Sequence, residues 1–213
     1  MNYERLYEFR FRGVNSEDRQ RVWNVIAEDV YQKMRRPRIV LDAAGGSGEF
    51  INGVPAEERW VVDRVSYGMI DSKVKVVTGD VLEVDLPAEH FEGIFVSNVL
   101  EHLPTQEAVA KLLGRLRSFL RPGGVIAIMG PNFRYCAKEY FDCADHTLAL
   151  THVSVEEHLY AAGFNILDVR RRYLPYSFRG RLPANSKLTA AYLRLMPLQA
   201  ILGKQFLVVA DRS

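Results

Sequence analysis

Two adjacent pairs of acidic and imidazole side chains have the composition of a proton-transfer site. The pairs are Glu101 with His102 and Asp145 with His146. A histidine oriented by a carboxylate can act as a general base toward a hydroxyl, and such assistance contributes ~100- to 10,000-fold to a rate. We predict that His146 is the base and that Asp145 orients it, with His102 as the second candidate. The alternative for either histidine is a structural group with satisfied hydrogen bonds.

A bare turn follows an apolar run in the stretch VLDAAGGSGEF, residues 40–50. Gly45, Gly46 and Gly48 permit positive φ angles and let a ligand lie against the backbone. The first N–H groups of a following helix favour an anionic or polar ligand. A dinucleotide fingerprint would have a third glycine where Ile51 stands. The turn therefore indicates a cofactor site other than that of an NAD-dependent dehydrogenase.

These groups need a scaffold, and the rest of the chain alternates between strand and helix patterns. Helices are expected over residues 16–34, 105–120, 154–162 and 188–195, the first of them capped by Ser16. Strands are expected at residues 39–41, 60–62, 74–77, 94–97, 125–129, 164–169 and 206–210. The alternation predicts an α/β fold with a doubly wound, mainly parallel sheet, which binds ligands at the carboxyl ends of its strands.

The first 36 residues are expected to form a helical segment in front of a single globular domain over residues 37–213. Tyr3, Tyr7, Phe9 and Phe11 precede an amphipathic helix in this segment. Such side chains could close over a ligand as a lid, or they could only pack on the sheet. Both interpretations stay open on the sequence.

Five segments in register resemble the motifs of one enzyme family. They are residues 40–50, Asp63, Thr78–Asp80, Phe91–Leu103 and Leu120–Gly124. Together they are similar to the class I S-adenosylmethionine-dependent methyltransferases over most of the chain. The resemblance implies a Rossmann-like, doubly wound, seven-stranded sheet, mostly parallel with one antiparallel strand near the edge. Ala44 stands where that family has its first glycine, and we expect it to keep φ below zero.

The resemblance also implies which residues would bind the cofactor, S-adenosylmethionine, and its product, S-adenosylhomocysteine. Asp63 would accept both ribose hydroxyls, and Asp80 would accept the adenine amino group with Val81 against the ring. On its own, either aspartate would more often be a helix cap or a solvated turn residue. The full expected set is Asp42, Ala44, Gly45, Gly46, Gly48, Phe50, Asp63, Arg64, Gly79, Asp80, Val81, Ser97 and Asn98.

Residues 130–164 and 174–183 resemble a bacterial subgroup that is often found in surface-polysaccharide gene clusters. We expect methyl transfer to a hydroxyl of a small polar acceptor, glycan-related or anionic. The expected substrate contacts are Asn132, Tyr135, Tyr140, Arg179 and Arg181. The alternatives are N-methylation of a small amine and a non-catalytic subunit that binds S-adenosylmethionine.

A metal centre is a further alternative at the acid–base pairs. Some similar methyltransferases place a divalent ion on a Glu-x-x-Glu-His segment, and this chain has Asn98 in place of the first glutamate. With His146 added, a site of oxygen and imidazole ligands can still be drawn. Because the lost carboxylate lowers the affinity for a cation, we expect no metal.

Composition and charge indicate which partners and which cellular compartment to expect. A net formal charge of +2 over 213 residues gives no general basic field, so no nucleic-acid partner is expected. Arg170–Arg172 would face either a pocket or solvent at a sheet edge. The chain has two cysteines and no long apolar run, so we expect a reducing compartment, no membrane span and a cytoplasmic location. The sequence leaves the oligomeric state open.

Overall fold

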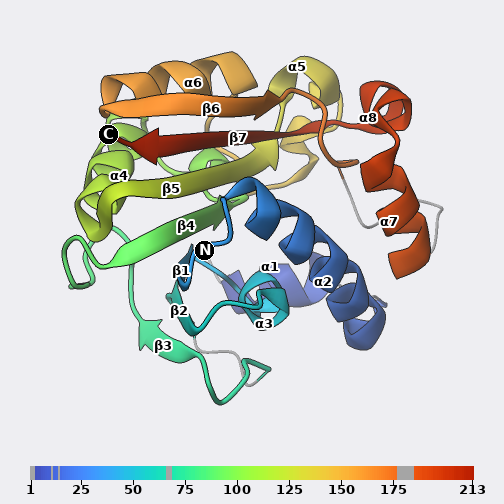
Figure 1. The fold of residues 1–213 in the computed structure, drawn as a ribbon. Coiled ribbons are helices and arrows are strands. Elements are labelled where there is room, and N and C mark those ends of the chain that lie inside the picture. The colour runs from blue at the N-terminus through green and yellow to red at the C-terminus, as the bar shows by residue number, and fades with distance from the viewer. Residues whose placement is uncertain (1–2, 11, 14, 66–68, 177–184) are drawn as a thin grey trace.

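The computed structural model describes residues 3–10, 12–13, 15–65, 69–176 and 185–213. Its centre is one seven-stranded sheet in the order β3-β2-β1-β4-β5-β7-β6. The strands are β1 (Ile39–Ala43), β2 (Glu58–Asp63), β3 (Lys75–Thr78), β4 (Phe91–Ser97), β5 (Leu120–Pro131), β6 (Phe164–Arg170) and β7 (Gln205–Arg212). β7 runs antiparallel to both of its neighbours, and β1 to β5 pair in parallel (Figure 1). The predicted fold class, with one antiparallel strand near the edge, is confirmed.

Helices cover both faces of the sheet. They are α1 (Tyr3–Arg10), α2 (Ser16–Lys33), α3 (Glu49–Gly53), α4 (Gln106–Phe119), α5 (Phe133–Cys136), α6 (His152–Ala161), α7 (Ser186–Arg194) and α8 (Met196–Leu202), with 3-10 turns η1 (Leu100–His102) and η2 (Tyr140–Asp142). The face that carries α4 and α6 has its own apolar cluster, and so has the face that carries α2 and α3. Within the described ranges, every helix falls short of the length or apolarity that crossing a bilayer takes.

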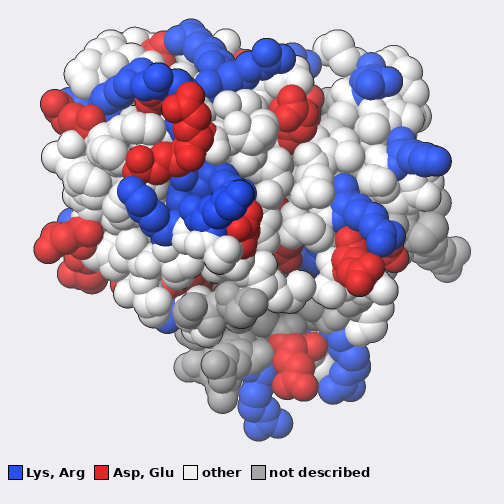
Figure 2. Space-filling view, turned by 60° about the horizontal axis from the view of Figure 1, so that its bottom comes forward, with Lys and Arg blue, Asp and Glu red and all other residues white. Residues whose placement is uncertain are grey.

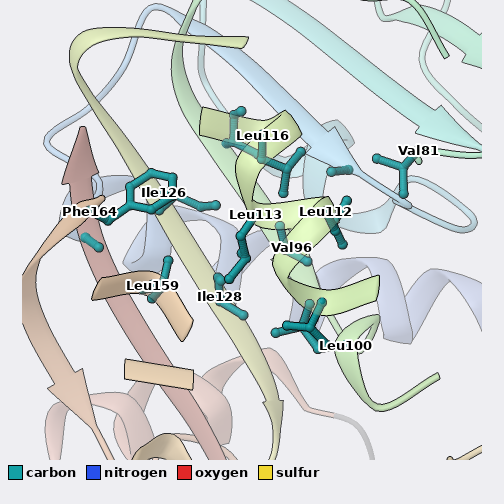
Figure 3. Packing of buried hydrophobic residues seen from close by; sticks show 14 of the residues in the cluster. Val81, Val96, Leu100, Leu112, Leu113, Leu116, Ile126, Ile128, Leu159 and Phe164 are labelled. Carbon is teal, nitrogen blue, oxygen red and sulfur yellow. The ribbon is translucent and has the colours of Figure 1, made fainter. Parts of the chain in front are cut away.

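The cluster under α4 shows how the sequence pattern builds the core. Leu112, Leu113 and Leu116 recur at helical spacing, and all three are fully buried. They pack toward Ile126 and Ile128 of β5 (Figure 3). Complete burial of such a side chain stabilises the fold by about 1.5–3 kcal/mol. This face therefore anchors β4 and β5, whose carboxyl ends carry the predicted acid–base groups.

On the opposite face, α2 lies across the centre of the sheet. Val22, Ile26 and Val30 are buried in one cluster with Val40 of β1 and Phe95 of β4. These strands are buried on both faces, which explains why their sequences read as continuous apolar runs and not as alternating patterns.

Most predicted elements exist, with corrected ends. All seven strands are present, but β5 extends to Pro131 and so carries the chain further toward the site. Asn15, and not Ser16, caps α2, because its side chain accepts the N–H groups of Glu17 and Asp18. The helix predicted from residue 154 begins earlier, because Thr151 forms a capping box there. The sequence reading missed α8 altogether.

Candidate active site

A cavity of about 760 Å³ opens at the carboxyl ends of β1, β2, β3 and β4. Its walls come from the turn after β1, the ends of β2 and β3, η1, residues 139–146 and the start of β7. A doubly wound sheet binds its ligands at this edge. The predicted catalytic residues, Glu101, His102, Asp145 and His146, all line this one cavity.

The glycine turn forms one end of the cavity. Gly46 and Gly48 have φ angles of 56° and 78°, which favour glycine. Gly45 needs a hydrogen for a different reason, since a Cβ there would lie 2.6 Å from both Asp42 Oδ2 and Val61 Cγ2. Of the three glycines, Gly45 and Gly46 line the cavity and Gly48 does not.

The expectation for Ala44 is wrong. Its φ angle is +62°, so the alanine adopts the conformation of the glycine that it replaces. The hydrogen bonds that close the turn, from Gly45 N to Val62 O and from Gly48 N to Gly45 O, hold the backbone in this shape. The left-handed conformation costs an L-residue roughly 1–2 kcal/mol, which the surrounding structure offsets.

Two aspartates hold the turn and leave acceptor capacity in the cavity. Asp63 Oδ2 accepts the N–H of Gly46 at 2.8 Å, and Oδ1 accepts that of Val65 at 3.1 Å. Asp42 is buried, and its Oδ2 has no hydrogen-bond partner among the described residues. Burial, together with the charges of Glu49 and Asp63, raises the pKa of Asp42 well above its ordinary value. A cationic ligand group would relieve this desolvated carboxyl.

The turn after β3 contributes a third aspartate. Asp80 accepts the N–H of Leu82 through Oδ1 and pairs with Arg64 through Oδ2 at 2.6 Å. Burial opposes ionisation, but these two bonds outweigh it and lower the pKa of Asp80. Gly79 and Val81, on either side of it, also line the cavity.

Phe50 and the end of β4 complete the predicted cofactor wall. Phe50 is buried and stacks on Phe95 at a centroid distance of 3.9 Å. Asn98 Nδ2 donates to Ser97 Oγ at 2.9 Å, and the Asn98 φ angle of 53° turns the chain into η1. Phe50, Ser97 and Asn98 all line the cavity.

The side chain of Asp145 contacts His102 and not His146, which follows it in the sequence. His102 Nδ1 lies 3.0 Å from the Asp145 backbone oxygen and 3.4 Å from its Oδ2, and His102 Nε2 lies 3.9 Å from Glu101 Oε1. Asp145 also accepts a hydrogen bond from Arg10 of α1. Burial raises the pKa of Asp145, but the bond from Arg10 and the neighbouring His102 outweigh it and lower the pKa. The expectation that Asp145 orients His146 is therefore corrected.

His146 lies beside this group and is partly buried. Its ring meets those of His102 and Tyr140 edge to face, and its Nδ1 is buried without a hydrogen-bond partner among the described residues. Burial and the neighbouring His102 lower the pKa of His146 to about 4. Burial also raises the pKa of Glu101, an effect that His102 partly offsets. His146 is thus a weak base, and Glu101 is a carboxyl with a reduced tendency to ionise.

The same side chains could hold a cation. Glu101, His102 and His146 each offer one ligand atom, and these atoms all lie within 4.8 Å of one another. Two imidazoles and one carboxylate form a ligand set typical of transition metals and zinc. Asn98 adds no carboxylate to this set.

The predicted substrate contacts lie elsewhere or outside the described residues. Asn132 is fully buried, where its amide contacts His152 Nδ1 and the backbone of Arg171. Tyr140 is also buried and donates to the Leu148 carbonyl, and Tyr135 stacks under the Arg172 guanidinium. The side chains of Asn132, Tyr135 and Tyr140 do not line the cavity, and their contact with a substrate stays a prediction. Arg179 and Arg181 fall outside the described residues.

Other cavity residues were missed from the sequence. Arg10 arrives from α1, Trp23 from α2, and Tyr176 and Lys204 from the chain on either side of α7 and α8. Lys204 forms an ion pair with Glu139 across the cavity wall. Trp23 lies on the helix that was predicted over residues 16–34. Nothing in its spacing, or in that of the other three, indicates that these distant segments meet.

Comparisons with known proteins agree with this geometry. A family described as a methyltransferase domain matches residues 16–169. A search of curated proteins found no match. A SAM-dependent methyltransferase from Archaeoglobus fulgidus is similar in structure, with a TM-score of 0.69 and 21% identity, over 99% of this chain and 100% of that one.

Two further similar structures carry out different reactions, so the fold alone does not decide the reaction. The 1,6-didemethyltoxoflavin-N1-methyltransferase of Burkholderia thailandensis, crystallised with S-adenosylhomocysteine, has a TM-score of 0.62 and 19% identity over 99% of this chain and 89% of that one. The [4+2]-cyclase SpnF has a TM-score of 0.61 and 14% identity over 89% and 80%. At such identities the likeness establishes the fold, and the family match carries the reaction.

The cavity fits the cofactor that this family uses. Gly46 lines the cavity, and a Cβ on it would project into open space, so its backbone can be approached by a ligand. Asp42 lines the same cavity, and its buried Oδ2 has no partner among the described residues. S-adenosylmethionine carries an ammonium and a sulfonium group, which suit a desolvated carboxyl. Because the family match spans most of the chain and the sheet has the expected topology, the chain belongs to the methyltransferase domain family and is a class I S-adenosylmethionine-dependent methyltransferase.

Proposed function

We propose that this enzyme methylates a hydroxyl of a small polar acceptor, glycan-related or anionic, with His102 as the general base. One observation carries the proposal, namely the position of His102 between Asp145 at 3.4 Å and Glu101 at 3.9 Å. When Nδ1 donates to the Asp145 carbonyl, Nε2 is left to accept a proton. The imidazolium that results is stabilised by the carboxylate of Asp145, whose pKa is lowered.

His102 is preferred over His146 as the base on electrostatic grounds. A general base works best when its pKa lies near the operating pH. The pKa of His146 is lowered to about 4, so its nitrogen has little affinity for the proton of a hydroxyl at neutral pH. His146 instead forms a wall of the acceptor site beside His102.

The remaining residues would position the cofactor. The cofactor, when bound, supplies a methyl group on a positively charged sulfur, which reacts by in-line displacement. The backbone of Gly45 and Gly46 and the carboxyl of Asp42 would hold its methionine end, and Asp63 its ribose. Asp80 would accept the adenine amino group. Alignment and exclusion of water are the main contributions that a protein makes to such a displacement.

Support for a polar acceptor comes from the far side of the cavity. Arg10, Lys204 and Tyr176 line it together with Glu139 and Asp142. Side chains of both charge signs, together with a hydroxyl group, suit an acceptor that carries several hydroxyls or an anionic group. The sequence resemblance of residues 130–164 to the polysaccharide-cluster subgroup points the same way.

Product analysis tests the proposal. The enzyme is incubated with S-adenosylmethionine and a panel of sugars, sugar nucleotides and small amines, and S-adenosylhomocysteine release is measured. We expect turnover with a hydroxyl acceptor and a methyl ether in the product by NMR. A methylamine product would establish the N-methyltransferase alternative. Tight S-adenosylhomocysteine binding without turnover on any acceptor would favour a non-catalytic subunit.

The cation-binding set allows a competing, metal-assisted version. A cation on His102 would occupy the nitrogen that we assign to proton transfer, so we expect turnover to persist after treatment with a chelator. Assays of chelator-treated enzyme with and without added Mg²⁺, Mn²⁺ or Zn²⁺ decide between the two. Loss of turnover that one of these ions restores would replace the base mechanism by a metal centre.

A further inference from the structure

Helices α7 and α8 expose a concentration of large apolar side chains. Ile201 is 70% exposed, Met196 64% and Leu188 57%. We call this surface the α7–α8 apolar face, and it consists of Leu188, Leu195, Met196, Leu198, Ile201 and Leu202. Soluble monomers rarely leave such side chains grouped without a partner.

Other side chains of α7 and α8 face the protein. Tyr192 and Leu193 of α7 turn inward and pack against the cluster that α2 also joins. Gln199 is the one buried residue of α8, where its amide donates to the Leu193 carbonyl. The exposed side chains are therefore carried by helices that pack on the domain through Tyr192, Leu193 and Gln199.

The segment around this face is basic throughout. Between Asp168 and Asp211 the sequence has eight Lys and Arg and no Asp or Glu, although the whole chain has 28 and 26. The rest of the chain therefore has 20 basic and 26 acidic residues. On the face shown in Figure 2, the two signs are interspersed. On α7, Lys187 and Arg194 are exposed and form no ion pair within the described part of the chain.

We infer that the α7–α8 apolar face binds the surface of an anionic phospholipid bilayer. A helix that lies in the interface buries its apolar side chains among the acyl chains and keeps Lys and Arg near anionic headgroups. Leu, Ile and Met side chains match the first requirement, and Lys187 and Arg194, which form no ion pair with any described residue, match the second. A second copy of this chain is a poorer occupant, because a symmetric contact would bring two basic segments together.

The face adjoins the cavity. Leu202 belongs to the face and also lines the cavity. Lys204, just after α8, lines the cavity too. Docking on a bilayer would thus place the cavity beside the lipid surface, where an acceptor with a lipid anchor is presented. This consequence rests on the proposed function, whereas the binding of the bilayer does not.

Vesicle flotation tests the inference with the full chain. Wild type should float with vesicles that contain phosphatidylglycerol and not with pure phosphatidylcholine, and added salt should weaken binding. Lys187→Gln with Arg194→Gln should weaken partitioning about 25-fold, since each basic side chain contributes about fivefold. Ile201→Ser with Leu198→Ser should weaken it by at least about tenfold. Tyr160→Ser, which removes a 76% exposed aromatic ring from α6, is the matched control and should change nothing.

The outcomes separate this inference from the proposed function. S-adenosylhomocysteine binding, measured for each variant, shows whether it is folded. Absence of wild-type flotation, or equal losses in Tyr160→Ser, overturns the inference. A dimer in sedimentation that Ile201→Ser dissociates assigns the face to a second copy instead. Lipid binding without methyl transfer to any hydroxyl leaves the inference standing and removes the proposed function.

Discussion

The two halves of the cavity are assembled from the chain in different ways. In the half that we propose for the cofactor, called the cofactor half, Gly46 bonds to Asp63 across 17 residues and Arg64 bonds to Asp80 across 16. In the half that we propose for the acceptor, called the acceptor half, the bond from Arg10 to Asp145 spans 135 residues and the contact of His102 with Asp145 spans 43. Successive strand ends build the first half, so its residues follow one another in sequence. The second half depends on how distant loops pack.

The difference has a functional consequence that experiments can isolate. Residues of the cofactor half should control the dissociation constant of S-adenosylhomocysteine. Residues of the acceptor half should control kcat or the acceptor KM and leave that dissociation constant unchanged. A variant in one half that changes the constant assigned to the other half would show that the two halves are coupled.

The largest effect is expected in the acceptor half, from His102→Gln. Loss of the base should lower kcat about 100- to 10,000-fold, while S-adenosylhomocysteine affinity in calorimetry stays within about twofold, since His102 contacts Asp145 and not the glycine turn. His90→Gln is the control, because that histidine pairs with Glu58 outside the cavity. A greater loss of kcat in His146→Gln than in His102→Gln would return the base assignment to His146.

The next effect lies in the cofactor half, from Asp63→Asn. Both carboxylate oxygens of Asp63 accept backbone N–H groups, and an amide can accept only one of them. The carboxylate of Asp63 holds the glycine turn through these bonds. Loss of one of them should weaken S-adenosylhomocysteine binding about 100-fold in calorimetry. Asp168→Asn, on the edge strand β6 and outside the cavity lining, should bind normally. Unchanged affinity of Asp63→Asn would remove Asp63 from the cofactor site.

Arg10→Ala tests whether the segment at residues 1–36 acts as a lid or only packs on the domain. The variant loses the ion pair with Asp145, whose two side chains are 16% and 4% exposed. Acceptor kcat/KM should fall about tenfold, because the group that orients His102 loses a charged partner. Arg12→Ala on the same segment should have little effect. If deletion of residues 1–13 leaves both Michaelis constants unchanged, the segment only packs on the domain.

The same division explains which features were predictable from the sequence. The seven strands and the glycine turn were found because apolar runs, turn glycines and strand order are local signals. The pairing of Asp145 with His102 was missed, since adjacency in sequence says nothing about where two neighbouring side chains point. The φ angle of Ala44 was missed because hydrogen bonds in the turn override the preference of an isolated alanine. Helix α8 was missed because its apolar side chains face outward.

Acidification should destabilise the protein through His146. Its pKa falls from the ordinary 6.5 to about 4 on folding. Between these values the unfolded chain binds a proton that the folded chain does not, so stability falls as the pH drops through this window and then levels off. In His146→Gln this part of the pH dependence should vanish. Urea unfolding at a series of pH values measures the difference, and equal slopes for both proteins would contradict the burial of a neutral His146.

The smallest effect is expected from Ala44→Gly, in the cofactor half. Glycine relieves the left-handed strain of roughly 1–2 kcal/mol but loses more backbone entropy on folding, about 0.5–1 kcal/mol. The net gain should be about 0.5 kcal/mol, seen as a rise in Tm of about 1–2 °C. Gly46→Ala is the matched reverse change, since its φ angle is 56° and a Cβ there would meet nothing within 4 Å. It should lower stability by about 1 kcal/mol through conformation alone. A lower Tm in Ala44→Gly would mean that the alanine methyl group, and not the backbone conformation, stabilises the turn.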